Sequence, residues 1–163
     1  MTLLDAAYWV ACVVLVVSGA TKLFDPTATE STLRELGLPA PRSVGRVLGA
    51  AEILLGAGGL LATPGTIAQA TAVFVALIYA LFALVVVAAY RRGLQDCGCL
   101  GVRSRAPTPG HAVLNVGFAA VAAASAAVGP VDLSGGLGSL SVGAAVAVGA
   151  LVAVLGGLVV ARV

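Results

Sequence analysis

The sequence has very little charge for its length. Only 10 % of its 163 residues are Asp, Glu, Lys or Arg, whereas about 25 % is usual in a soluble domain. So few charged side chains cannot cover a globular protein in water, and this excludes an ordinary soluble enzyme. The net charge is only +2, and no segment forms the basic face that nucleic acid binding requires.

Apolar residues take the place of the missing charge. The chain is 60 % hydrophobic and contains 21 glycines, and its mean hydropathy is +1.10. A disordered chain would be poor in apolar residues, while small residues are frequent where membrane helices pack closely. We therefore expect an all-α, polytopic membrane helix bundle, a single domain over residues 1–163 in the lipid bilayer of the cell membrane.

Charged residues divide the sequence into five apolar runs. A helix needs about 20 apolar residues to cross a bilayer, so each run is a candidate span. The shortest run would depend on Lys22 reaching the membrane interface. We expect a four-helix antiparallel core with a fifth transmembrane helix packed outside it. The expected spans are residues 6–21, 44–62, 67–90, 112–129 and 140–161.

A short amphipathic helix is expected between the first two spans. Asp25 precedes a proline, which is typical of a helix start, and Gly37 near another proline is typical of a helix end. Leu33 and Leu36 are three residues apart and share one face. We expect this helix, residues 26–36, to lie along the membrane surface.

Basic residues occur only in alternate connections. With five spans, all nine Lys and Arg lie on one side of the membrane. The positive-inside rule then places the N-terminus outside and the connection containing Cys97 and Cys99 inside. The basic residues are Lys22, Arg34, Arg42, Arg46, Arg91, Arg92, Arg103, Arg105 and Arg162.

Two of the three cysteines form a Cys-Gly-Cys motif before the fourth expected span. Gly98 lets the backbone bring the thiols of Cys97 and Cys99 together, and strained disulfides tend to be labile and catalytic. Neighbouring arginines favour the reactive thiolate. We interpret the pair as a redox site, with soft-metal ligation and a structural role as alternatives. A metal site usually needs more ligands than two cysteines. The sequence adds only His111 and Cys12 as further ligands, so no metal site is expected.

Glu52 is the only charged residue in the centre of an apolar span. Glycines at spacings of three and four residues share its face, so the carboxylate is expected to face another helix and not lipid. An ionisable residue inside a membrane indicates a functional site, and a structural ion pair is the alternative. We expect its partner in the first span, between Ser18 and Lys22. The glycines are Gly45, Gly49, Gly56 and Gly59.

His111 and Asn115 begin the fourth expected span on one helix face. His111 is the only histidine, and imidazole exchanges protons near neutral pH. It is therefore a candidate catalytic residue beside Cys97 and Cys99, and a helix cap is the alternative.

Three motifs together resemble a known family. The stretch from Ser18 to Pro26 is similar to the S-G-x-x-K-x-x-D-P signature of the DoxX/MauE group. Glu52 in a glycine-rich second span, and the Asp-Cys-Gly-Cys-Leu-Gly motif with Asn115 downstream, resemble the MauE branch, the methylamine-utilisation proteins. Leu100 stands where the usual member has Phe.

The resemblance covers about residues 8–125 and implies a function. Members are regarded as redox-associated and as working with a thioredoxin-like partner in forming disulfides of an extracytoplasmic enzyme. Their four-helix core is similar in layout to that of quinone-linked thiol oxidoreductases. The resemblance assigns the chemistry to Cys97 and Cys99, and it gives supporting positions to Lys22, Asp25, Glu52 and Asn115.

The sequence therefore favours membrane thiol–disulfide exchange with a thioredoxin-like protein, with a quinone as a candidate acceptor. Disulfide chemistry outside the cytoplasm conflicts with the charge pattern, which predicts that Cys97 and Cys99 lie inside, unless electrons cross the membrane. In that case Cys12, midway along the first span, is a candidate relay. The alternatives are a non-catalytic assembly subunit or chaperone, and a soft-metal-ion transporter.

Overall fold

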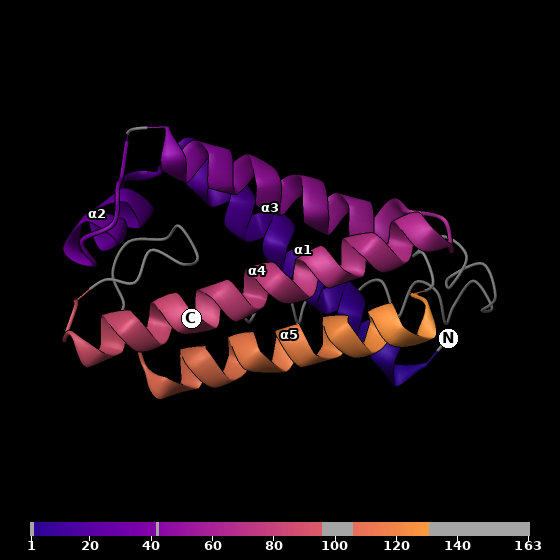
Figure 1. Cartoon of the computed structure of the whole chain (residues 1–163). Helices are drawn as coiled ribbons and strands as arrows, with labels where there is room; N and C mark the ends of the chain where they lie inside the picture. The colour runs from indigo at the N-terminus through magenta and orange to yellow at the C-terminus, as the bar shows by residue number, and fades with distance from the viewer. Residues whose placement is uncertain (1, 42, 96–105, 131–163) are drawn as a thin grey trace, which may run out of the picture.

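The computed structural model describes residues 2–41, 43–95 and 106–130. In these ranges the regular secondary structure is helical, and one short helix lies beside four long ones (Figure 1). The helices are α1 (Leu3–Phe24), α2 (Thr27–Glu35), α3 (Val44–Leu61), α4 (Thr66–Arg91) and α5 (Pro109–Val128).

The four long helices are long and apolar enough to cross a membrane. This confirms an all-α, multi-pass membrane protein. α1, α3, α4 and α5 overlap the first four expected spans, and the fifth expected span, residues 140–161, lies outside the described residues.

α1 extends beyond its expected span at both ends. Thr2 and Asp5 form a capping box, in which the Thr2 N–H donates to Asp5 Oδ2 at 2.6 Å and the Asp5 N–H donates to Thr2 Oγ1 at 3.3 Å. Each of the two side chains therefore satisfies the backbone N–H of the other residue. At the other end, Lys22 is inside the last turn and fully buried. α1 therefore reaches the length of a membrane span with the Lys22 side chain buried between helices.

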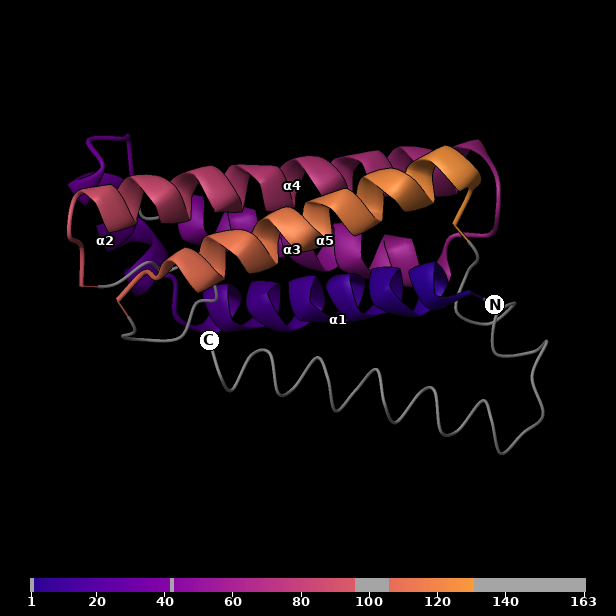
Figure 2. The ribbon, with the colours of Figure 1, turned by 90° about the horizontal axis from the view of Figure 1, so that it is seen from below.

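The long helices alternate in direction and lie side by side (Figure 2). α1 packs mainly on α3, and α4 packs mainly on α5, while α1 also contacts α5. Aromatic and aliphatic side chains fill the space between them. The buried cluster includes Tyr8, Trp9, Leu15, Val75, Ile78, Tyr79 and Phe82.

Glycines bring α1 and α3 into backbone contact. A Cβ placed on Gly49 would lie 2.6 Å from the Gly19 carbonyl oxygen, and one on Gly56 would lie 2.5 Å from the Cys12 carbonyl oxygen. Any side chain at these positions would push the helices apart. The expectation that the glycine stripe faces another helix is confirmed, and that helix is α1.

α2 lies at the end of the bundle where α1 ends and α3 begins (Figure 1). α2 begins at Thr27, one residue later than expected, and Pro26 is the N-cap residue. Asp25 Oδ1 still accepts from the Thr27 N–H at 3.2 Å and so satisfies a donor of the first turn. The buried face is more polar than expected of a helix lying on lipid. It consists of Ala28, Thr29, Glu30, Thr32 and the following Leu36.

Candidate functional site

A buried ion pair joins α1 to α3. Lys22 Nζ lies 3.0 Å from Glu52 Oε1 and donates to Glu52 Oε2 at 3.0 Å, and both side chains are 0 % exposed. Lys22 comes from the last turn of α1, and Glu52 comes from the middle of α3. The expectation that Glu52 faces the first span and finds a polar partner there is confirmed.

Ser18 and Phe82 complete the surroundings of the ammonium. Side chains on a helix lean toward its N-terminus, so the Lys22 stem runs back along α1 to Ser18, one turn earlier. Lys22 Nζ donates to Ser18 Oγ at 2.6 Å, and it lies 5.2 Å from the centroid of the Phe82 ring of α4. Three helices therefore contribute to one charged site.

The glycines of α3 make this pairing possible. Gly49 lies one turn before Glu52, and the carbonyl of Gly19 fills the space that a Gly49 side chain would need. A carboxylate and an ammonium are costly to remove from water, and their attraction offsets that penalty only when they are in close contact. Close approach of the two backbones supplies that contact.

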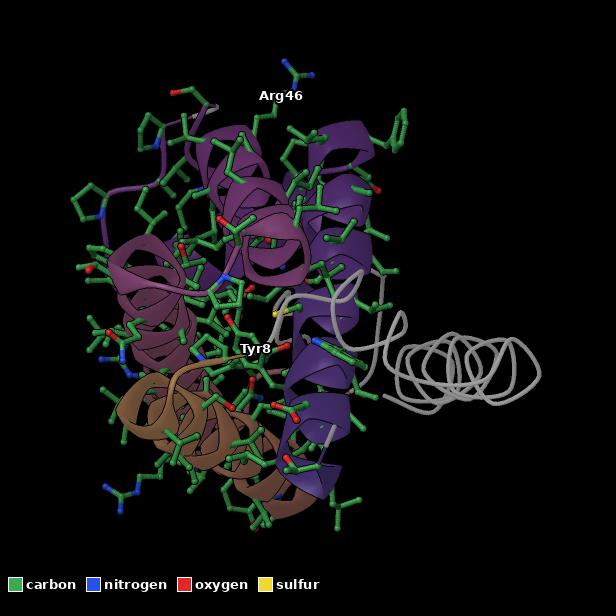
Figure 3. All side chains as sticks on the ribbon, turned by 90° about the vertical axis from the view of Figure 1, so that its right-hand side faces the viewer. Tyr8 and Arg46 are labelled. Atoms are coloured by element: carbon green, nitrogen blue, oxygen red, sulfur yellow. The ribbon has the colours of Figure 1, made fainter. Side chains whose placement is uncertain are left out.

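A second buried polar group lies on the same face of α1, nearer to its N-terminus. Tyr8 Oη and Cys12 Sγ both adjoin Gly59, where an added Cβ would lie 2.7 Å and 2.6 Å from them. Tyr79 of α4 donates its hydroxyl to the Ala11 carbonyl at 2.6 Å. Figure 3 shows Tyr8 directed into the bundle, whereas Arg46 lies at its outer edge. Cys12 is thus buried among helices.

His111 takes part in the capping box at the N-terminus of α5, where Thr108 is the N-cap residue. Its Nδ1 accepts from the Thr108 N–H at 3.2 Å, and its own N–H donates to Thr108 Oγ1 at 3.4 Å. Asn115 Nδ2 in turn donates to the His111 carbonyl at 2.8 Å. The geometry matches the helix-cap alternative, and a catalytic role for His111 stays a prediction.

Cys97 and Cys99 lie outside the described residues. The described chain stops at Gln95 after α4 and resumes at Ala106 before α5. These two helix ends lie at the same end of the bundle as α2 (Figure 1). The Arg92 guanidinium donates to the Glu35 carbonyl at 3.0 Å and so joins α4 to α2 at that end.

Exposed basic side chains gather at this α2 end of the bundle. They belong to the end of α2, the start of α3 and the end of α4, and they are Arg34, Arg46, Arg91 and Arg92. The described arginines of α2, α3 and α4 all belong to this end of the bundle. The arginines that alternate connections of the sequence carry are therefore also close in space, as far as the structure describes them.

The structure brings some predicted site residues together and separates others. Lys22 and Glu52 share one site, whereas exposed Asp25 belongs to the start of α2. Among the described residues, no group of three or more His, Cys, Asp or Glu side chains could hold a metal ion. The soft-metal alternative gains no support from them.

Sequence reasoning missed two contributors. The cap by Thr108 had a signal, because it precedes a proline at the first helical position. Phe82 had no such signal, since its contact with Lys22 depends on how α4 is rotated against α1.

Comparison with known proteins identifies the family. The family model for methylamine utilisation protein MauE matches residues 1–129, a range that contains α1 to α5. The wider DoxX grouping suggested by the signature is not part of this match. No curated protein and no solved structure matches the chain. With four described helices able to span a membrane, the chain belongs to the MauE family and is a multi-pass membrane protein.

Proposed function

We propose that this MauE-family membrane protein exchanges disulfides through Cys97 and Cys99. The observation that carries the proposal is the Cys-Gly-Cys motif in the connection between α4 and α5. The end of α4 and the start of α5 lie at the α2 end of the bundle (Figure 1). Exposed arginines of α2, α3 and α4 belong to the same end. Positive charge favours the thiolate, which is the form that attacks a disulfide.

The proposed reaction transfers two electrons and two protons. A thiolate of a thioredoxin-like partner attacks the Cys97–Cys99 disulfide, and one of these two sulfurs leaves as a thiolate. The partner's second thiol resolves the mixed disulfide, which leaves the partner oxidised and both cysteines as thiols. A membrane quinone then accepts the two electrons and two protons and becomes a hydroquinone, while Cys97 and Cys99 form a disulfide again. Run in reverse, the same steps reduce the partner.

The charge distribution supports an orientation for this chemistry. Basic residues favour the cytoplasmic side of a membrane, so we propose that the α2 end faces the cytoplasm and that the N-terminus lies outside. Reporter fusions at each terminus test this proposal, and a C-terminal fusion active only outside the cell would contradict it. The family is described by its part in methylamine utilisation, and we propose that the exchange serves that process.

Trapping a mixed disulfide tests the function. In the Cys97→Ser and Cys99→Ser variants, the remaining thiol can attack the disulfide of an oxidised thioredoxin-like partner, which is the reverse direction of the exchange. The second thiol that would release the reduced partner is missing, so a covalent complex should accumulate. Cys12→Ser is the matched control, because Cys12 is buried between the helices. Full disulfide turnover in cells that carry the double Cys97→Ser, Cys99→Ser variant would contradict the proposal and favour a non-catalytic assembly subunit.

A further inference from the structure

The end of α4 fixes the direction in which the chain enters the cysteine-containing connection. Arg92 is the C-cap residue of α4, and Gly93 has a φ of 67°, a left-handed conformation that favours glycine. The Gly93 N–H donates to the Tyr90 carbonyl at 3.1 Å, and the Leu94 N–H donates to the Ala89 carbonyl at 3.1 Å. These two bonds form a Schellman motif, so the backbone path out of α4 is defined as far as Leu94.

α2 ends in the same way and leaves one carbonyl open to another helix. The Gly37 N–H donates to the Arg34 carbonyl at 2.9 Å, and the Leu38 N–H donates to the Leu33 carbonyl at 2.9 Å. The last carbonyls of a helix have no partner within it, and these two bonds do not use the carbonyl of Glu35. That carbonyl can therefore accept a hydrogen bond from a side chain elsewhere in the protein.

Arg92 supplies that side chain. Its guanidinium donates to the Glu35 carbonyl at 3.0 Å, so the C-cap residue of α4 also caps the C-terminus of α2. A cation is favoured at this end of a helix, because the macrodipole is negative there. The acceptor is a neutral carbonyl, and among the described residues Arg92 forms no salt bridge. Its charge is therefore held in place without being neutralised.

Covalent geometry then limits where the first cysteine can lie. Cys97 follows Leu94 by three residues, and an extended chain spans at most about 3.6 Å per residue. The Cys97 Cα therefore lies within about 11 Å of the Leu94 Cα, and the Leu94 N–H is bonded to α4. The bond from Arg92 to the Glu35 carbonyl brings the end of α2 to this same point of departure.

We propose that Arg92 is a positioning residue for disulfide exchange: its bond to the Glu35 carbonyl holds α2 against the start of the connection, so that Cys97 meets the partner at a fixed place beside α2. This proposal rests on the proposed thiol exchange for its purpose. A protein partner docks in a restricted orientation, so its sulfur reaches Cys97 only if the surface that it docks on and the cysteine are fixed relative to each other. A small dithiol approaches from many directions and does not need this.

The hold on α2 is tested without any thiol chemistry. Spin labels at Arg34→Cys in α2 and Leu84→Cys in α4, both exposed positions, report the distance between the two helices. The full chain is measured in lipid vesicles by dipolar electron paramagnetic resonance, with the three native cysteines replaced by serine. We expect a narrow distance distribution when Arg92 is present and a broad one in Arg92→Gln. An equally narrow distribution in Arg92→Gln would overturn the proposal.

The positioning role is tested by two rates with the native cysteines present. One is the kcat/KM for exchange between the Cys97–Cys99 disulfide and reduced thioredoxin, and the other is the rate of the same exchange with dithiothreitol. In Arg92→Gln the ratio of the first to the second should fall about tenfold, since a misplacement of about 1 Å can cost up to about a hundredfold. Circular dichroism shows whether each variant is folded.

Arg91→Gln is the matched control, because it removes the same charge from the neighbouring exposed residue. An effect of charge on the thiolate lowers both rates in both variants, so the ratio should stay at the wild-type value in Arg91→Gln. A ratio that falls equally in the two variants, or that is unchanged in Arg92→Gln, would contradict positioning by Arg92. A wild type that does not react with dithiothreitol would refute the thiol function, while the spin-label distances still decide whether Arg92 holds α2.

Discussion

Replacing Gly49 by alanine should weaken the contact between α1 and α3. An added Cβ would lie 2.6 Å from the Gly19 carbonyl oxygen and 3.2 Å from the Leu23 nitrogen, where an ordinary contact needs at least 3.4 Å. Both atoms belong to the backbone of α1, so a rotamer change cannot relieve the clash. The helices must separate, and the Lys22–Glu52 contact between them lengthens with the same movement.

The expected magnitude follows from two opposing effects. Overpacking costs about 3 kcal/mol when the neighbour is rigid, and replacing a helical glycine by alanine gains about 1 kcal/mol. Gly49→Ala should therefore lower the free energy of unfolding by about 2 kcal/mol. Gly117→Ala is the matched control, because a Cβ on Gly117 meets no described atom within 4 Å. Gly117→Ala should therefore show only the stabilisation of about 1 kcal/mol that alanine brings to a helix.

Reversible unfolding in mixed micelles, with a denaturing detergent as titrant, measures both variants. The difference of about 3 kcal/mol between them corresponds to more than a hundredfold in the unfolding equilibrium constant. Helical content by circular dichroism reports the transition. If Gly49→Ala is as stable as Gly117→Ala, the backbone contact between α1 and α3 does not limit their packing and the reasoning is wrong.

Three further substitutions test single interactions in the same assay. Lys22→Met should destabilise the bundle by about 3 kcal/mol or more, because it leaves the Glu52 carboxylate buried and unpaired. Adding Glu52→Gln should recover most of this loss, and losses that add in the double variant would contradict the coupling of the two residues. Tyr79→Phe should cost about 1 kcal/mol by removing the hydrogen bond to the Ala11 carbonyl, and an unchanged midpoint would show that this bond contributes nothing. Thr108→Ala should cost about 1 kcal/mol by removing the side-chain cap of α5. Amide hydrogen exchange should become faster only in the first turn of α5, and faster exchange throughout α5 would contradict a local cap.

The positions of the helices were largely predictable, but their ends were not. Apolar runs of sufficient length identify membrane helices, because a backbone in lipid must satisfy its hydrogen bonds internally. Charges were used as boundaries, and both charges that bounded the first run belong to the helix. Asp5 is there because it caps the first turn, and Lys22 is there because Glu52 and Ser18 pair with it.

For the short helix α2, the sequence predicted the helix but not the face that it buries. Its existence followed from Asp25 and the nearby prolines, which act locally on the backbone. Its buried face did not follow from the leucine spacing. Thr29, Glu30 and Thr32 are buried there, because the helix packs at the end of the bundle, where polar side chains can be shielded by protein and not by lipid.

The sequence by itself determined the membrane environment, the helical fold, the family and the face of α3 that approaches another helix, because composition and periodicity are properties of local chain segments. It also restricted the partner of Glu52 to a few residues of the first span. Only the tertiary structure decided that Lys22 is this partner and that Ser18 and Phe82 surround its ammonium. These contacts depend on the distance and rotation between α1, α3 and α4, which are set by backbone packing across the bundle and which no single segment encodes.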